Sequence, residues 1–198
     1  MQLLCSPASP YSVKVRMAAR YLGIPLSEVK VDSAAAPAEL TDNNPLGKIP
    51  TLTLDDGRSI FDSRAIMHFL DRSSDAKLYP ADNQARTDVE VLEALCDGIT
   101  DALIAIAYER RFRPAEIVHQ PWIDRQWAKV TRGLDYLDAN LPETTEQLHA
   151  GHFALAGMIG YLDLRYAGLW EDGRPALVAW TDTFAEHFPH YFEMKSKL

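Results

Sequence analysis

The first third of the chain switches between two hydrophobic periods. Residues 2–5 form a short apolar run that predicts a strand, and residues 26–31 (LSEVKV) alternate apolar and charged positions, which predicts another. Between them a helix is expected to begin at Pro10, since proline is favoured in the first turn, and to end at Gly23 and Pro25. The apolar positions of this helix recur every four residues, at Val13, Met17 and Tyr21.

A hairpin and a second helix follow a polar loop. Residues 51–54 and 59–61 are short apolar segments joined by residues 55–58 (DDGR), and a short Asp-Gly turn favours an antiparallel hairpin. Ser63 is then expected to cap a helix over 64–72. The predicted order is βαβ, loop, ββα. The apolar stripe of the second helix is Ala65, Ile66, Phe69 and Leu70.

Strand signals disappear in the rest of the chain. The pattern predicts an α/β domain over 1–74, a polar linker over 75–85 and an all-helical domain over 86–198. The segment 153–166 (FALAGMIGYLDLRY) is apolar on nearly all sides, which is typical of a helix buried by its neighbours. Apolar residues recur at helical spacing in two further segments, at Val89, Leu92, Leu95, Ile99, Leu103 and Ile106, and at Ile123, Trp127, Val130, Leu134, Leu137 and Leu141.

Composition narrows the class of protein. The chain has 198 residues with 47% apolar and 24% charged residues, as in an ordinary globular protein. Its net charge of −8 argues against binding to nucleic acid or an anionic membrane. We find no run of about 18 apolar residues and no basic secretory start, so we expect a cytoplasmic protein. His149 and His152 have a spacing that a metal site could use, but we expect a helix start there instead.

Four segments carry a resemblance to a known family: SPASPYSVKVR, NPLGKIPTL, FDSRAI and the apolar helix ending in GYLDLRY. In this order and spacing they resemble the glutathione S-transferase superfamily, over essentially the whole chain. The resemblance implies a thioredoxin-like N-terminal domain (βαβ-ββα) followed by an all-α helical bundle, which matches the element order above. It also implies a homodimer, in which the thioredoxin-like domain of one subunit meets the bundle of the other.

The resemblance assigns chemistry to residues 9–12 (SPYS), which align with the CPYC turn of glutaredoxins. Ser9 takes the position of the nucleophilic cysteine at a helix N-terminus, where an anion is favoured. Two interpretations stay open: Ser9 is only an N-cap, or its hydroxyl holds the thiol of glutathione as a thiolate. Neither Ser9 nor Ser12 can form a mixed disulfide, which disfavours a disulfide oxidoreductase. Cys5 and Cys96 are expected to be buried apolar residues.

A glutathione site is implied by the same resemblance. Pro50 would be a cis-proline that exposes the backbone of Ile49 to the cysteinyl unit, and Lys48 would meet the glycyl carboxylate. Asp62 and Ser63 would hold the γ-glutamyl group at a helix start. The alternatives are an ordinary trans-proline, a solvated lysine and a plain helix cap.

The electrophile pocket is expected between the domains, beside the first long helix of the bundle. The candidates are Tyr11, Tyr108, Arg111 and Arg113, near Glu109. A charged run such as ERRFR is also typical of a solvated helix face, whereas as a binding surface its arginines suit an anionic or carboxylated substrate.

The residues and the resemblance together indicate an enzyme that transfers alkyl or aryl groups to glutathione, or that uses glutathione to reduce a small electrophile. Its partners would be glutathione, as cosubstrate, and a small electrophile, with no metal, nucleic acid or membrane. The alternative function is a glutathione-fold binding or carrier protein with little or no turnover. One departure concerns residues 149–152 (HAGH), where the family places a Ser/Thr-x-x-Asp cap before the central helix. The start of this helix is therefore expected to be held differently.

Overall fold

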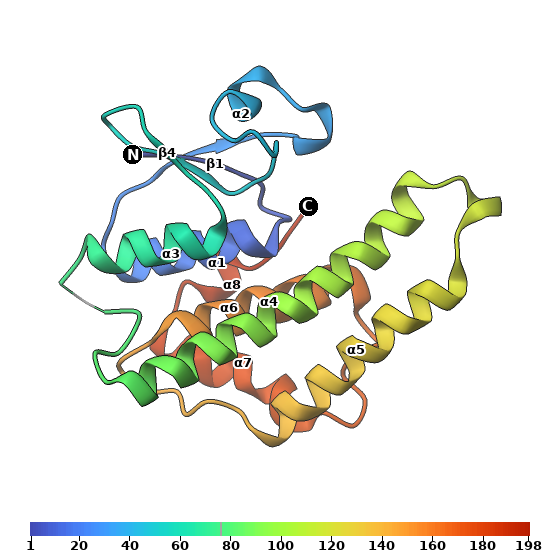
Figure 1. Ribbon diagram of the computed structural model, residues 1–198. Coiled ribbons are helices and arrows are strands. Elements are labelled where there is room, and N and C mark those ends of the chain that lie inside the picture. Colours follow the sequence, from blue (N-terminus) through green and yellow to red (C-terminus); the bar gives the residue numbers. More distant parts are fainter. Residues whose placement is uncertain (76) are drawn as a thin grey trace.

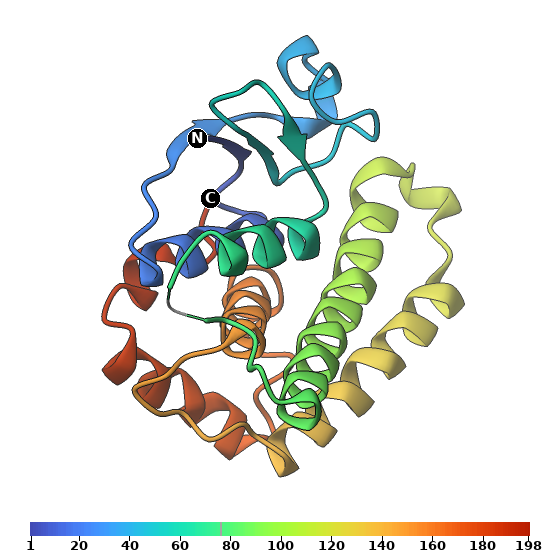
Figure 2. The ribbon, with the colours of Figure 1, turned by 60° about the vertical axis from the view of Figure 1, so that its left-hand side comes forward.

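The computed structural model describes residues 1–75 and 77–198; residue 76, inside the predicted linker, lies outside the described residues. Its two layers are an α/β domain and a helical domain, packed against each other (Figures 1 and 2). The α/β domain contains β1 (Gln2–Cys5), α1 (Pro10–Tyr21), β2 (Ser27–Lys30), η1 (Ser33–Ala35), α2 (Ala38–Thr41), β3 (Thr51–Thr53), β4 (Ser59–Ile60) and α3 (Ser63–Arg72).

The sheet has four strands in the order β2-β1-β3-β4. Strands β1 and β2 are parallel, as expected for the βαβ unit, whereas β3 pairs antiparallel with both β1 and β4. Leu4 lies opposite Thr51, and Leu52 lies opposite Ile60. This topology confirms the predicted βαβ-ββα order, with η1 and α2 forming inside the segment that was expected to be a polar loop.

Helices α1 and α3 run side by side on the face of the sheet that meets the helical domain, and α2 lies on the other side (Figure 1). Helix α1 begins as predicted, with Ser9 as N-cap and Pro10 in the first turn. The cap of α3 is a correction. Asp62 is the N-cap, because its carboxylate accepts the Arg64 N–H at 2.8 Å, and Ser63 is the first helical residue.

The helical domain holds the long helix α4, which crosses the whole domain (Figure 1). The central helix, α6, packs against both α1 and α4. Every residue of α6 from Ala150 to Leu162 is buried, which confirms the expectation from its uniform apolar pattern. The elements are α4 (Asn83–Phe112), η2 (Ala115–Ile117), α5 (Gln120–Ala139), α6 (Ala150–Tyr166), α7 (Pro175–His187) and α8 (Tyr191–Met194).

The start of α6 is held by a pair of histidines. The His149 N–H donates to Nδ1 of His152 at 3.1 Å, and the Nε2 of His152 lies 3.1 Å from the carbonyl oxygen of Glu143. Since Nδ1 accepts, Nε2 carries the proton and donates, so His152 is held neutral. Burial is the main cause that lowers the pKa of His149 to about 3 and that of His152 to about 4. The side chain of His152, at position N3, thus accepts the backbone N–H of the N-cap residue, as the N3 residue of a capping box does.

Candidate functional site

Three segments that are distant in the sequence meet at one edge of the sheet. The residues after Cys5 leave this edge to enter α1, and β3 starts at the same edge, because it is antiparallel to β1 with Thr51 opposite Leu4. Strand β4 is antiparallel to β3 and ends here, at Ile60, before α3 begins. The topology therefore brings together the turn before α1, the segment before β3 and the start of α3. Each of these segments carries residues that the family resemblance assigns to glutathione binding.

Ser9 is half-buried at the N-terminus of α1. Its Oγ accepts the N–H of Ser12 at 3.3 Å, and its carbonyl oxygen accepts the N–H of Val13 at 2.9 Å. A hydroxyl oxygen that accepts a capping bond still has its proton to donate, so Ser9 can both cap the helix and donate to an anion. Ser12 is buried, and its Oγ accepts the Ser6 N–H at 3.4 Å within the turn.

The segment before β3 is a loop fixed by a buried asparagine. Nδ2 of Asn44 donates to the carbonyl oxygen of Lys48 at 2.8 Å, and the Thr51 hydroxyl donates to the same oxygen at 2.9 Å. The Ile49–Pro50 bond is cis, as expected. Among the described residues the backbone N–H and C=O of Ile49 have no hydrogen-bond partner. This half-buried residue can therefore pair with an extended ligand, while the Lys48 side chain extends into solvent.

The start of α3 combines a negative side chain with free helix donors. Asp62 is exposed, and its Oδ1 accepts both the Arg64 N–H and, at 3.4 Å, the Ser63 hydroxyl. Ser63 is buried. Because the first N–H groups of a helix lack intrahelical partners, this position can hold a carboxylate, with Asp62 beside it for a cation.

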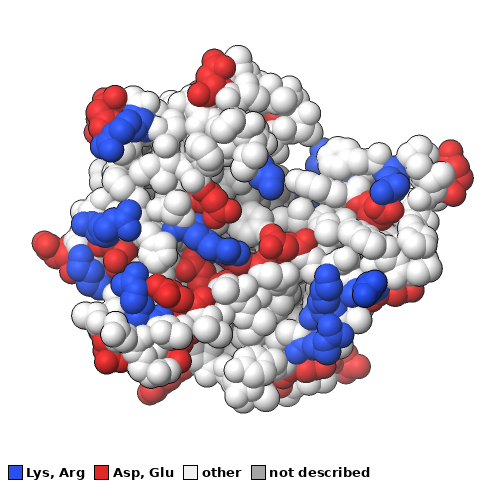
Figure 3. Space-filling view, in the orientation of Figure 1, with Lys and Arg blue, Asp and Glu red and all other residues white. Residues whose placement is uncertain are grey.

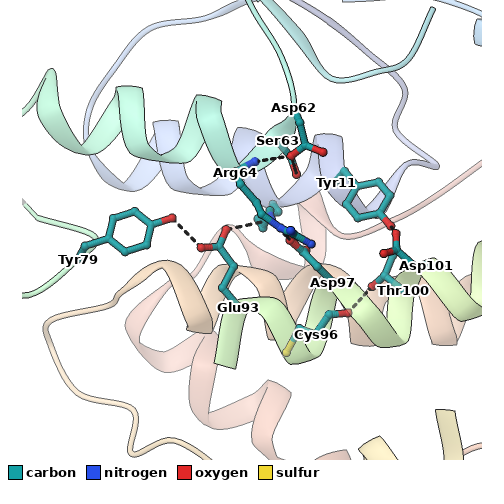
Figure 4. Close-up of polar contacts among 11 residues, drawn as sticks. Tyr11, Asp62, Ser63, Arg64, Tyr79, Glu93, Cys96, Asp97, Thr100 and Asp101 are labelled. Carbon is teal, nitrogen blue, oxygen red and sulfur yellow. Dashed lines mark hydrogen bonds and ion pairs between the residues drawn. The ribbon is translucent and has the colours of Figure 1, made fainter. Parts of the chain in front are cut away.

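Tyr11 ties the turn to the helical domain. Its hydroxyl donates to the carboxylate of Asp101 on α4, and both side chains point into the junction between the domains (Figure 4). Burial, followed by the hydrogen bond to Asp101, raises the pKa of Tyr11, so the phenol stays protonated. The proton that Tyr11 would need for a thiolate is already donated to Asp101.

A buried charge network lies one helical turn further along α1. Lys14 is almost completely buried, and its ammonium group lies 3.0 Å from Glu93 and 2.9 Å from Asp97 on α4. The Tyr79 hydroxyl donates to Glu93 at 2.7 Å, and Nε of Arg64 lies 2.9 Å from Asp97 (Figure 4). Burial opposes the charge of Lys14, but the two carboxylates outweigh it, and its pKa is raised. Sequence reasoning missed this network, because only the fold brings Lys14 to its partners.

The candidates for the electrophile pocket differ in how their side chains are placed. Tyr108 and Arg111 are exposed near the end of α4. Arg113 instead pairs with Glu109, with 2.7 Å between Nε and the carboxylate, and Glu109 is nearly buried. The four-residue spacing of this pair was readable from the sequence.

Neither cysteine is placed to act as a nucleophile. Cys5 and Cys96 are buried, as expected, with exposures of 2% and 0%. Burial is the main cause that raises the pKa of Cys5 to about 11, and burial also raises the pKa of Cys96. Both therefore stay protonated at neutral pH.

The surface of the junction carries charges of both signs. Acidic and basic side chains lie beside one another where the α/β domain meets the helical domain (Figure 3). Within residues 1–75 and 77–198, no group of three His, Cys, Asp or Glu side chains is arranged to hold a metal ion. None of the helices in this same part of the chain has the length and apolarity needed to span a bilayer.

Two family models match separate parts of the chain. The glutathione S-transferase N-terminal domain matches residues 8–73, and the glutathione S-transferase C-terminal domain matches residues 120–183. The first match contains all three segments that meet at the edge of the sheet. The second covers most of α5, α6 and α7.

Individual relatives match nearly the full length. The uncharacterized GST-like protein YibF of Escherichia coli is 31% identical over 183 residues, which are 90% of each chain. A glutathione transferase family member from Pseudomonas fluorescens, solved with bound glutathione, is 34% identical with a TM-score of 0.90, covering 100% of this chain and 99% of that one. The P. fluorescens family member has also been solved with S-(propanoic acid)-glutathione, matching at 33% identity, a TM-score of 0.88 and 99% of each chain.

A third structure, a glutathione S-transferase from Methylobacillus flagellatus solved with glutathione, is 37% identical with a TM-score of 0.90. It covers 100% of this chain and 99% of that one. Both domains, their order and the full length of the fold are thus shared with these proteins. The chain therefore belongs to the glutathione S-transferase family.

Proposed function

We propose that this protein is a glutathione transferase in which Ser9 holds the thiol of glutathione as a thiolate for attack on a small electrophile. The observation that carries the proposal is the convergence of the Ser9 turn, the free backbone of Ile49 and the start of α3 at one edge of the sheet. Relatives at 34% and 37% identity that are solved with glutathione support the same site.

Each part of the tripeptide has a matching group at this edge. The cysteinyl unit would pair with the unpartnered backbone of Ile49, in the manner of an added strand. The glycyl carboxylate would meet Lys48. The γ-glutamyl carboxylate would bind the first N–H groups of α3 with the Ser63 hydroxyl, and its amino group would pair with Asp62. This placement leaves the sulfur at the N-terminus of α1, beside Ser9.

The energetics allow a hydroxyl and a helix end to ionise the thiol. A thiol with a pKa of ~8.5 is only ~3% ionised at pH 7, and lowering that pKa by ~2 units needs ~2.7 kcal/mol. One hydrogen bond to a charged group supplies ~1.5–3 kcal/mol, and a helix N-terminus adds ~0.3–1 kcal/mol. The thiol proton leaves to water, and the sulfur then attacks the electrophile. Because a weaker base is a weaker nucleophile, positioning of the electrophile must supply most of the acceleration.

The test removes the Ser9 hydroxyl. Ser9→Ala is expected to lower kcat/KM for conjugation by about 10- to 100-fold, which is the kinetic equivalent of one hydrogen bond to an anion. The pKa of bound glutathione, followed by ultraviolet absorbance of the thiolate, should rise toward that of the free thiol. Ser12→Ala is the matched control, because its hydroxyl faces Ser6 within the turn. An unchanged thiol pKa in Ser9→Ala would refute the role of Ser9.

The same measurements separate an enzyme from a carrier. A carrier would bind glutathione but turn over no member of a broad electrophile panel. Two expectations from the family accompany the proposal: a homodimer, which light scattering in solution would test, and a cytoplasmic location, which cell fractionation would test.

A further inference from the structure

Two helices extend beyond the Ser9 turn and form facing walls. On α4, Asp97 meets Lys14 and Asp101 meets Tyr11, and Tyr108 lies two turns further along the same face, with Arg111 on the next turn. These residues lie along one face of α4, from the buried Asp97 to the exposed Arg111 near the end of the helix. The glutathione sulfur, held at the start of α1, would lie between these two ends.

The second wall is α6. At Gly157 an added Cβ would lie 2.9 Å from the carbonyl oxygen of Pro10, so this face of α6 packs directly under the turn. Tyr161 and Arg165 follow at successive four-residue steps on the same face. Burial raises the pKa of Tyr161, and the charges of Arg165 and Arg111 act in the opposite direction. Helix α6 packs against α4, and both stripes start at the first turn of α1, at Gly157 on α6 and at Asp101 on α4.

Two carboxylates near these walls are already paired with other cations. Glu109 pairs with Arg113 at 2.7 Å, and Asp163 pairs with Lys195 at 2.9 Å. Within residues 1–75 and 77–198, Arg111 and Arg165 have no carboxylate within ion-pair distance. The Arg111 guanidinium lies 5.1 Å from the ring centre of Phe112, a contact that leaves its N–H groups free to donate. In a chain of net charge −8, two arginines that lack a carboxylate partner among the described residues favour an anionic ligand here.

We propose that the electrophile carries a carboxylate, which Arg111 and Arg165 bind from opposite walls of the pocket. This inference rests on the proposed function and deepens it, because it names the class of the second substrate. Arginine suits the role, since its planar group donates two parallel hydrogen bonds to a carboxylate. Both arginines set specificity without touching the sulfur.

With a 3-halopropanoate the reaction balances without a further reactant. The thiolate sulfur of glutathione attacks the carbon that bears the halogen, a C–S bond forms, and the C–halogen bond breaks. The halide leaves with the bonding electron pair, and the thiol proton has already passed to water. The product keeps its carboxylate two carbons from the sulfur, within the pocket that the arginines line.

The test compares two glutathione conjugates that differ only in charge. S-(2-carboxyethyl)glutathione and its carboxamide analogue have nearly the same size, and isothermal titration calorimetry would give the affinity of each, beside that of glutathione. Wild type is expected to bind the acid about tenfold more tightly than the amide, a preference typical of two exposed ion pairs. The preference should shrink as salt is added. With 3-bromopropanoate and 3-bromopropanamide, kcat/KM should follow the same order after subtraction of the uncatalysed rates.

Substitutions of the two arginines test whether they cause the preference for the acid. Arg111→Gln with Arg165→Gln is expected to remove the preference for the acid and to leave the affinities for the amide and for glutathione unchanged. Arg110→Gln is the matched control on α4, because Arg110 faces a separate cavity of about 220 Å³ that α5 also lines. Equal binding of acid and amide by wild type would overturn the inference alone, as would a preference that survives in the double variant. Absence of any binding of glutathione and its conjugates would overturn the proposed function as well.

Discussion

The two halves of α4 present the same face to the junction, but charged side chains on this face are buried and paired in the first half and exposed in the second. In the first half, Glu93 and Asp97 are buried, at 3% and 4% exposure, and the ammonium group of Lys14 pairs with both. In the second half, Tyr108 and Arg111 are exposed, and Arg111 lacks a carboxylate partner among the described residues. Tyr11 and Asp101 lie at the boundary between the two.

The contrast separates a structural task from a ligand-binding one. A buried charge is tolerated only when it is paired, so the first half of α4 can join the domains only with its partners in place. An exposed arginine is solvated at little cost and stays available for a ligand. The same helix can therefore fix the position of the turn at one end and select the substrate at the other.

The largest effect is expected from removing the charge of Lys14. Lys14→Met leaves Glu93 and Asp97 buried with fewer cations, and breaking a buried ion pair typically costs ~3–5 kcal/mol of stability. Urea unfolding would measure this loss. Arg111→Gln is the matched change in the exposed half and is expected to alter stability by less than ~0.5 kcal/mol. A Lys14→Met protein as stable as Arg111→Gln would remove the distinction between the two halves.

The next largest effect is expected from a buried pair that is kept neutral, His149 and His152. The pKa values of His149 and His152 are about 3 and about 4 in the folded protein, below the ordinary 6.5. Between these limits the unfolded chain binds protons that the folded chain does not, so stability falls as pH drops from about 6.5 toward about 4. Each of the two imidazoles is expected to contribute a loss of up to about 1.4 kcal/mol per pH unit in this range.

His152→Asn keeps an acceptor for the His149 N–H and removes one of the titrating groups. The expected outcome is lower stability near neutral pH, from lost packing, but a shallower decline in acid. Urea unfolding of both proteins at about pH 8 and about pH 5 would measure the two slopes. Parallel slopes for wild type and variant would show that other groups dominate the acid response.

A small effect on stability is expected at the boundary. Tyr11→Phe removes the hydrogen bond to Asp101, and because Asp101 is exposed, water can replace the lost donor. The loss of stability is expected to be about 1 kcal/mol or less. If Tyr11 only positions the turn, the variant raises KM for glutathione while the pKa of the bound thiol stays unchanged. A rise of that pKa as large as in Ser9→Ala would instead make Tyr11 a direct partner of the sulfur.

Local motifs in the sequence were enough to propose most residues of the glutathione site. Ser9, the segment before Pro50 and the start of α3 each begin an element, and caps and prolines have fixed positions in such starts. The cap itself was assigned one residue too late, at Ser63. Serine and aspartate are equally good caps, so the sequence alone did not favour Asp62.

The electrophile side was less accessible to sequence reasoning. Tyr161 and Arg165 belong to a helix whose apolar pattern predicts burial, and that signal gave no indication of the role in substrate binding that we propose for them. Their four-residue spacing could have been noticed, but not the arrival of Arg111 from another helix. The pairing of Glu109 with Arg113, in contrast, has a spacing that a helix makes predictable.

The sequence by itself determined the main strands and helices of the α/β domain, their order, the change to an all-helical second part and the helix start that Ser9 caps. These depend on interactions between residues a few positions apart, which periodicity and capping residues record directly. Tertiary structure alone decided that Lys14 is buried beside Glu93 and Asp97, and that Arg111 and Arg165 have no carboxylate partner among the described residues. Such outcomes depend on which distant side chains arrive at the same place, and a buried and a solvated lysine look alike until packing removes the water from one of them.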